Sequence, residues 1–288
     1  MNRTISLRAV TLVCLAMGAL ASVAAQAATN SKARMKAFSA MQDWHGMWEL
    51  DGAPGTLQPQ PASAGGPGAA APVNLADPTG GNPSPGASAG AARPVQRDYM
   101  PYNAEWEAHY QTLLKGDYSK IAGQNTNTRY CAAGMPRVLA SPFMFEVIVT
   151  PEKTWMIFTQ REIRHIYTDG RAHPSEDAVI RTLWGDSVGH WEGGTLVVDT
   201  TDVIPGLWLD PSAATLSDAM EIKERWSMVD QDHLQNQITI VDPKALTAPW
   251  SFTRKYKRVK DFDRMIDDIC GENDRNPIVD GKMQTLVK

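Results

Sequence analysis

The chain has few cysteines, no excess of positive charge and no nucleotide-binding signature. Its 288 residues include three cysteines, and its formal net charge is −4. A net negative chain does not favour nucleic acid or an anionic membrane surface as a partner, so we expect neither. Phosphate-loop, dinucleotide-binding and kinase motifs are also absent, so no nucleotide cofactor is predicted.

The six histidines do not have the spacing of a metal site. His-x-His and His-Glu-x-x-His are both absent, and so is the Cys-x-x-Cys-His that attaches haem. A zinc or iron site would need three ligands that converge in the fold. We predict no metal and no cofactor; haem bound through a single histidine is the alternative that the sequence leaves open.

Residues 1–27 have the pattern of a secretory signal. Arg3 and Arg8 make the start positive, residues 9–25 form an apolar run short for a membrane span, and Ala25-Gln26-Ala27 fits a cleavage site. We therefore expect a periplasmic or secreted mature protein without an integral membrane segment. Export exposes the protein to an oxidising compartment.

The cysteines outside the signal are expected to pair in that compartment. Cys14 lies in the signal, which leaves Cys131 and Cys270 as a predicted disulfide. Closing so long a loop would stabilise the fold by about 5 kcal/mol in the chain-entropy model. Two buried free thiols are the alternative.

A segment of low complexity divides the remaining chain. Residues 51–97 are dominated by Ala, Gly, Pro and Ser and show no apolar periodicity, so we predict a disordered insert. The N-terminal segment 28–50 precedes it, with a predicted strand at 44–50. The predicted barrel domain, 98–288, follows it and begins with a helix in 102–117, where apolar residues have helical spacing.

From residue 143 onward, apolar and polar residues alternate with a period of two. Short turns such as Asp169-Gly170 separate these runs, which predicts eight or nine strands. No long helix lies between them, so we do not expect parallel crossovers. An antiparallel up-and-down β-barrel hides the edges of such a meander best, and a two-sheet sandwich is the alternative. The predicted strands are 143–150, 154–160, 163–168, 186–192, 195–201, 219–229, 234–243 and 250–259, with a short helix at 261–270.

Residues 185–189 read Gly-x-Ser-x-Gly, the pattern of a serine nucleophile elbow. An elbow needs a helix after the serine, whereas a diglycine turn and a β-branched run follow Ser187. The Gly-Asp-Ser start also resembles esterases of the Gly-Asp-Ser-Leu group. The chain has a Gly-x-Asn-Asp block at 271–274 and an Asp-x-x-His at 230–233, but in the reverse of that group's order. Hydrolysis through Ser187 is therefore the third functional hypothesis.

A two-residue turn at Gly193-Gly194 sets the register of the predicted hairpin. His190 and Asp199 become diagonal neighbours on one face, and we expect them to line the interior as a candidate acid–base site. Asp186 and Glu192 flank them, and we expect these two acids to be solvated. The expected pairs are Glu192 with Thr195, His190 with Val197 and Val188 with Asp199.

Two further strands carry candidate residues. His165 and Tyr167 share one face, either as ordinary strand residues or in the cavity beside His190. Glu224 lies on the same face as Trp226 and other apolar residues, where an acid is costly unless it is paired. It either belongs to an interior site or reaches water at an edge.

Several motifs resemble those of known families. Gly46-Met47-Trp48 is similar to the Gly-x-Trp of lipocalins, in which the tryptophan closes the base of the barrel. Five other segments together resemble a family of secreted bacterial proteins of unassigned activity, over residues 44–276 without the insert. That resemblance implies a calycin-like barrel and supplies no activity. The segments are CAAGMPR, IYTDGRAHP, WGDSVGHWEGGTLVVDTT, VDPKALTAPW and CGENDRN.

The sequence therefore predicts an exported barrel whose apolar, tryptophan-rich cavity binds a small apolar or aromatic molecule. The alternative is a cofactor-independent lyase, isomerase or hydratase. In it His190 is the general acid or base, Asp199 orients it, and Tyr167 or Glu224 is the opposite proton donor. The predicted ligand-binding residues are Trp48, His165, Trp184, Trp191 and Trp226.

Overall fold

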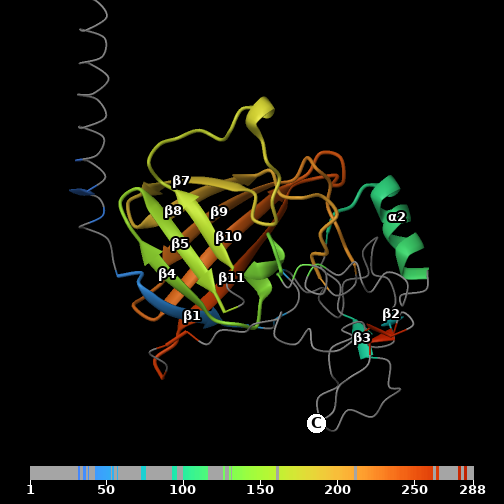
Figure 1. The fold of residues 1–288 in the computed structure, drawn as a ribbon, viewed down its shortest axis with the longest axis horizontal. Helices are drawn as coiled ribbons and strands as arrows, with labels where there is room; N and C mark the ends of the chain where they lie inside the picture. Colours follow the sequence, from blue (N-terminus) through green and yellow to red (C-terminus); the bar gives the residue numbers. More distant parts are fainter. Residues whose placement is uncertain are drawn as a thin grey trace, which may run out of the picture.

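The computed structural model describes residues 43–52, 100–115, 132–159, 162–210 and 213–261, with isolated residues and short strands elsewhere. Nine strands close into a barrel in the order β1-β11-β10-β9-β8-β7-β6-β5-β4 (Figure 1). The predicted all-β barrel is confirmed. Its strands are β1 Gly46–Leu50, β4 Phe145–Val149, β5 Lys153–Phe158, β6 Ile163–Tyr167, β7 Asp186–Glu192, β8 Thr195–Thr201, β9 Glu221–Met228, β10 His233–Val241 and β11 Trp250–Arg258.

The β7–β8 hairpin has the register that its two-residue turn predicts. Glu192 opposes Thr195, His190 opposes Val197, and Val188 opposes Asp199. Side chains alternate between the two faces of each strand, so this register decides which residues enter the barrel.

One neighbouring pair of strands is parallel, and the expectation of a purely antiparallel barrel was wrong at that point. β6 and β7 pair through Ile166 with Ser187 and Tyr167 with Val188. In a closed ring, strand directions can alternate throughout only if the number of strands is even, so nine strands require one parallel neighbour. The crossover 168–185 returns the chain outside the barrel, and its helical part is the single turn η3, Glu176–Ala178 (Figure 1).

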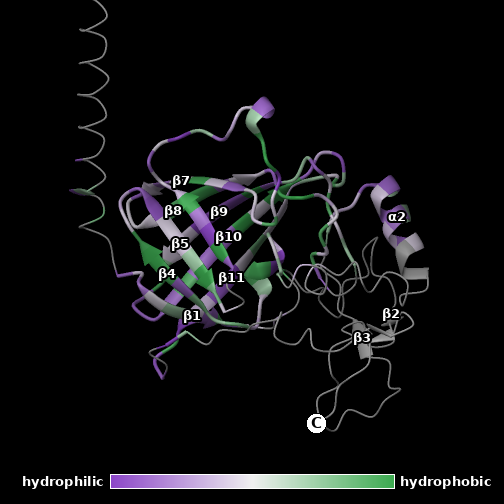
Figure 2. Ribbon diagram, in the orientation of Figure 1, coloured by the Kyte–Doolittle hydropathy of each residue, from purple (hydrophilic) through white to green (hydrophobic). Residues whose placement is uncertain are grey.

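The interior is filled by aromatic and aliphatic side chains. Hydrophobic and hydrophilic segments alternate along the barrel strands (Figure 2). Trp226 stacks on Tyr256 with ring centroids 5.2 Å apart, and Phe145 meets Tyr256 edge-on at 5.3 Å. Such pairs contribute beyond the area they bury, so this aromatic cluster fixes the barrel walls against one another.

Trp48 supports the barrel from the middle of β1. It is fully buried, and its Nε1 donates a hydrogen bond to the backbone oxygen of Trp44 at 3.1 Å. The Arg258 guanidinium lies 4.3 Å from the centroid of the Trp48 ring. Arg258 also donates to the backbone oxygens of Asp43 and His45, so it ties the chain before β1 to the end of β11.

A short helical turn packs against the barrel core beside β11. This turn, η2, spans Arg137–Ala140, and the Tyr256 hydroxyl donates to the Leu139 backbone oxygen at 2.9 Å. The predicted helix is also present, as α2, Ala104–Lys115. Asn103 caps it by accepting a hydrogen bond from the Trp106 backbone N–H at 2.9 Å.

Most of the insert lies outside the described residues, so the prediction of disorder there stays a prediction. Within it, β2, Val73–Leu75, pairs with β3, Arg93–Val95, in a two-stranded sheet in which Val73 opposes Val95. Two more short strands, β12 Ile278–Val279 and β13 Lys282–Met283, also pair.

Several sequence predictions lie outside the described residues. These are the secretory signal at 1–27, the disulfide between Cys131 and Cys270, and most of the helix at 261–270. Of the helices in the described part of the chain, none is long and apolar enough to cross a membrane.

Gly185 is expected to be essential for the junction between the crossover and β7. Its φ is +66°, and an added Cβ would lie 2.2 Å from the Thr201 backbone oxygen. We expect Gly185→Ala to lower the free energy of unfolding by about 3 kcal/mol or more, because backbone strain and a backbone clash add. Thermal unfolding measures this. Gly194→Ala is the control, since Gly194 has open space and no positive φ, and equal losses in both variants would contradict the prediction.

Candidate functional site

His190 and Asp199 face outward, so their expected place in the interior was wrong. The His190 side chain is 63% exposed and hydrogen-bonds the Glu192 carboxylate at 3.1 Å. Asp199 pairs with Lys223 at 3.3 Å on the same outer surface. The opposite face of the hairpin is the more apolar one, and its burial turns these polar side chains to solvent.

Glu224 lies inside the barrel and is paired there, as the interior alternative for this residue predicted. Its carboxylate forms a two-point ion pair with the Arg164 guanidinium, and both side chains have no exposed surface. The Nη1–Oε1 contact is 3.1 Å. Arg164 was missed in the sequence, although it is the one charged residue on the buried face of β6. That position was the available signal, because a buried charge needs a partner.

Neutral side chains complete this ion pair. Oε1 of Glu224 accepts hydrogen bonds from Trp226 Nε1 at 3.0 Å and from Asn236 Nδ2 at 2.8 Å. Arg164 Nη2 donates to the Thr200 hydroxyl at 2.9 Å and to the Ser187 hydroxyl at 3.3 Å. This set of residues satisfies both charges internally, as a buried pair requires.

Ser187 belongs to that network and does not have the surroundings of a nucleophile. Its hydroxyl lies 2.8 Å from the Thr200 hydroxyl and accepts from Arg164. Within the described ranges, no histidine hydrogen-bonds it, so no base is placed to remove its proton. The geometry does not support hydrolysis through Ser187.

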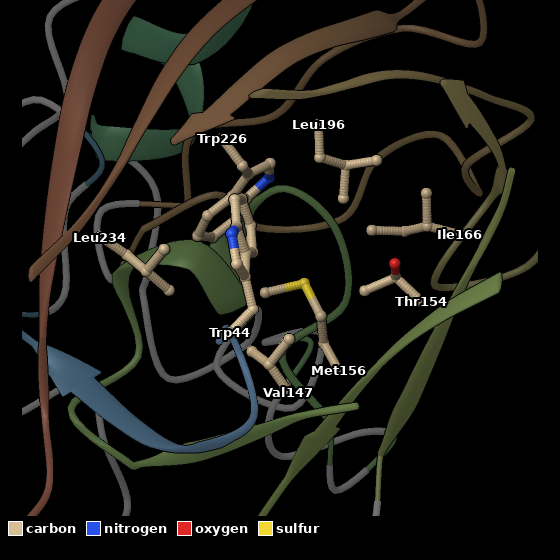
Figure 3. Close-up of a pocket in the computed structure, with 8 residues that line it drawn as sticks. All are labelled: Trp44, Val147, Thr154, Met156, Ile166, Leu196, Trp226 and Leu234. Carbon is tan, nitrogen blue, oxygen red and sulfur yellow. The ribbon is translucent and has the colours of Figure 1, made fainter. Parts of the chain in front are cut away.

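The space inside the barrel is too small for an organic ligand. The interior cavity has a volume of about 10 Å³, and eight side chains point into it from opposite walls (Figure 3). That is room for about one water molecule. The predicted tryptophan-rich, apolar lining is present, with Trp44 and Trp226 in it, but this cavity between described residues is smaller than the ligand-sized one that was expected. The barrel's own aromatic side chains fill that volume.

A larger hollow lies where β6 and β7 separate. This cleft has a volume of about 200 Å³. Gly185 ends the parallel ladder, because its N–H turns toward the Thr182 backbone oxygen, 3.4 Å away, and not toward β6. The lining residues are Ile163, His165, Tyr167, Trp184, Gly185, Asp186 and Ser187.

The β6 side of the cleft is aromatic and lies beside cations. His165 and Tyr167 are neighbours with ring centroids 6.2 Å apart. The Tyr167 ring is contacted by Lys153 Nζ at 4.6 Å and by the Arg171 guanidinium at 3.9 Å. Burial and the charge of Lys153 lower the pKa of His165, which favours a neutral imidazole in the cleft. Both residues were predicted as site residues, and the structure brings them together on the outer face.

The opposite side carries an indole and a carboxylate. Trp184 stacks on Phe158 with centroids 5.4 Å apart, which anchors it to the core. Asp186 hydrogen-bonds His173 Nδ1 at 2.7 Å, and both side chains are about three-quarters buried. His173 Nε2 is buried and has no hydrogen-bond partner among the described residues. His173 lies in the crossover 168–185, which brings it to Asp186.

The other predicted ligand-binding tryptophans serve the fold. Trp48 lies under Arg258, and Trp191 meets Trp44 edge-on with centroids 5.1 Å apart. Trp226 does line the small interior cavity. In the part of the chain that the structure describes, no three or more histidine, cysteine or acidic side chains gather as metal ligands.

Compared with known protein families, with curated proteins and with solved structures, the chain matches none of them. The assignment of function therefore depends on the geometry of the site.

Glu162 is a second buried acid that sequence reasoning missed. It is 7% exposed, and neither carboxylate oxygen has a hydrogen bond of good geometry among the residues described. Burial raises its pKa to about 7, although the backbone of Ala133 opposes the shift. The acid two residues before Arg164, on the same strand face, was the available signal.

Breaking the buried ion pair is expected to cost much more than breaking an exposed one. Arg164→Met should lower the free energy of unfolding by about 3–5 kcal/mol, because Glu224 loses its buried counter-charge. The double variant with Glu224→Met should recover most of that loss. Urea unfolding measures both, and Arg225→Met, which breaks an exposed pair with Glu192, is the control. A double variant no more stable than Arg164→Met would contradict this account.

The raised pKa of Glu162 predicts a specific pH dependence. The folded state holds this proton up to about pH 7, whereas the unfolded chain releases it near pH 4.5, the ordinary pKa of a glutamate. The folded state binds more protons between these values, so this residue's contribution to stability falls as pH rises through that window. Glu162→Gln should remove the slope, and Glu221→Gln, at an exposed position, should keep it. Melting temperatures from pH 4.5 to 7.5 that are parallel for wild type and Glu162→Gln would refute this.

Proposed function

We propose that this barrel binds a small aromatic molecule in the cleft between β6 and β7, and not in its interior. The observation that carries the proposal is the difference in volume, about 200 Å³ against about 10 Å³. A small ligand fits the first space, whereas the second requires the core to unpack.

The chemistry of the lining supports an aromatic ligand. Tyr167, His165 and Trp184 offer ring surfaces, and aromatic rings favour offset or edge-on contact with one another. Asp186 and the hydroxyl of Tyr167 add polar groups at the margin, which can orient a ligand. The proposed ligand is thus of the class that the sequence suggested, but its proposed site is on the outer face and not in the interior.

Binding should depend on the cleft and not on the interior cavity. We expect that aromatic compounds found by screening the exported protein will bind Tyr167→Ala about 10-fold more weakly, because one ring contact is lost. Thr154→Val changes the interior cavity and Thr253→Ala changes the outer face of β11; both should bind as wild type. Titration calorimetry measures the affinities. Loss of binding in Thr154→Val with none in Tyr167→Ala would place the ligand inside.

A catalytic function is the second candidate, and the His173–Asp186 pair favours it. The carboxylate holds Nδ1 of His173 at 2.7 Å, which leaves Nε2 as the nitrogen that could accept a proton. Asp186 also lines the cleft, so one member of the pair would lie beside a bound ligand. If the bound compound is turned over, His173→Gln should abolish turnover and leave its affinity within about 3-fold. Undiminished turnover in that variant would remove this candidate.

A further inference from the structure

The backbone of β6 has a free edge inside the cleft. Along β6, the Phe158 N–H donates to the Glu162 oxygen, and the Thr168 N–H donates to the Glu152 oxygen, both at 2.8 Å. Backbone groups alternate in direction along a strand, so residues 162, 164, 166 and 168 bond to β5. The N–H and C=O groups of Ile163, His165 and Tyr167 therefore point toward β7.

β7 uses only part of that edge. The parallel ladder consists of the pairs Ile166–Ser187 and Tyr167–Val188. In this register Ser187 bonds to the His165 carbonyl and the Tyr167 N–H. If the ladder continued beyond the N-terminal end of β7, residue 185 would bond to the Ile163 carbonyl and the His165 N–H. That residue is Gly185, and its backbone turns away from β6. In the described part of the chain, no strand pairs with Ile163–His165 on this side.

Unpaired backbone groups at a strand edge favour a ligand that continues the ladder. A ligand that replaces residue 185 needs an N–H donor and a C=O acceptor separated by one carbon, both facing β6. An N-acylated amino-acid unit in an extended conformation has this arrangement. The outward side chains of His165 and Tyr167 flank the position that its own side chain would take.

We infer that the cleft recognises an N-acylated amino-acid or peptide unit with an aromatic side chain, which pairs with the His165 N–H and the Ile163 C=O as the missing residue of β7. This inference rests on the proposed binding function and specifies the chemistry of its ligand. The backbone supplies hydrogen bonds, and Tyr167 and Trp184 supply the aromatic surface.

Proline substitution tests the free edge without any ligand. Pro is tolerated where the N–H that it removes is unpaired, so His165→Pro should fold, with a melting temperature close to that of His165→Ala. Ile166→Pro removes a hydrogen bond to β5 and should unfold the barrel or lower its melting temperature sharply. Amide hydrogen exchange should be faster at His165 than at Ile166. If both prolines unfold the protein equally while His165→Ala folds, the free edge is refuted.

Matched probes test the ligand. N-acetylphenylalaninamide should bind the exported protein, and its analogue methylated on the acylated nitrogen should bind about 2- to 10-fold more weakly, because one hydrogen bond is lost. His165→Ala keeps the backbone donor and should retain that discrimination between the probes. His165→Pro should bind the unmethylated probe more weakly than His165→Ala does. Equal affinity of both probes for the wild type would overturn the inference.

The same probes separate this inference from the proposed function and identify the source of the unit. Aromatic compounds that bind through Tyr167 without discrimination against the methylated probe would overturn the inference and leave the proposed function standing. If no aromatic compound binds in a way that Tyr167→Ala weakens, both the inference and the proposed function are overturned. If the natural ligand is a peptide, N-acetyl-Ala-Phe-Ala-amide should bind at least as tightly as N-acetylphenylalaninamide. If the natural ligand is a free acylated amino acid, the longer probe should bind more weakly. Either result supports the inference only if the wild type also binds the methylated probe more weakly than the unmethylated one.

Discussion

Closing nine strands into a ring is the constraint on which the other features of this structure depend. Because the number is odd, one neighbouring pair has to run in parallel, and that pair is β6 with β7. A parallel pair requires a crossover, which the chain makes outside the barrel with residues 168–185. The same crossover carries His173 to Asp186, and its last residue, Gly185, ends the parallel ladder. The cleft results directly from the parallel pairing of β6 with β7 and from the early end of that ladder at Gly185.

The interior is occupied by its own polar and aromatic groups. Arg164 and Glu224 satisfy each other and are surrounded by neutral donors and acceptors, so the two charges need neither water nor a ligand. Trp226, which donates to Glu224, also stacks on Tyr256, and this links the polar network to the aromatic cluster. A buried ion pair is weak support for stability on its own, but removing one member leaves a bare charge. The interior therefore acts as a core, and the proposed binding cleft lies on the outer face.

The outer face differs from one side of the barrel to the other. The outward residues of β9 are mostly charged, with Glu221, Lys223 and Arg225 in succession. Those of β6 are Ile163, His165 and Tyr167, and the first of these is 46% exposed. Where apolar and aromatic residues lie together at outward positions, a binding surface is a common reason. The cleft, its aromatic side and its free strand edge all lie on this one part of the wall.

The sequence by itself determined the strands, the barrel and the register of the β7–β8 hairpin, because period-two alternation and a two-residue turn are local properties. It also placed Glu224 on a buried face. It could not decide which face of the hairpin turns inward. His190 and Asp199 lie on one face and Leu196 and Val198 on the other, and only the closed barrel determines which of the two faces is buried. The pairing of Arg164 with Glu224 and of His173 with Asp186 joins residues from different parts of the wall. Only the tertiary structure brings them together, since closing an odd number of strands into a ring requires a crossover that no local pattern records.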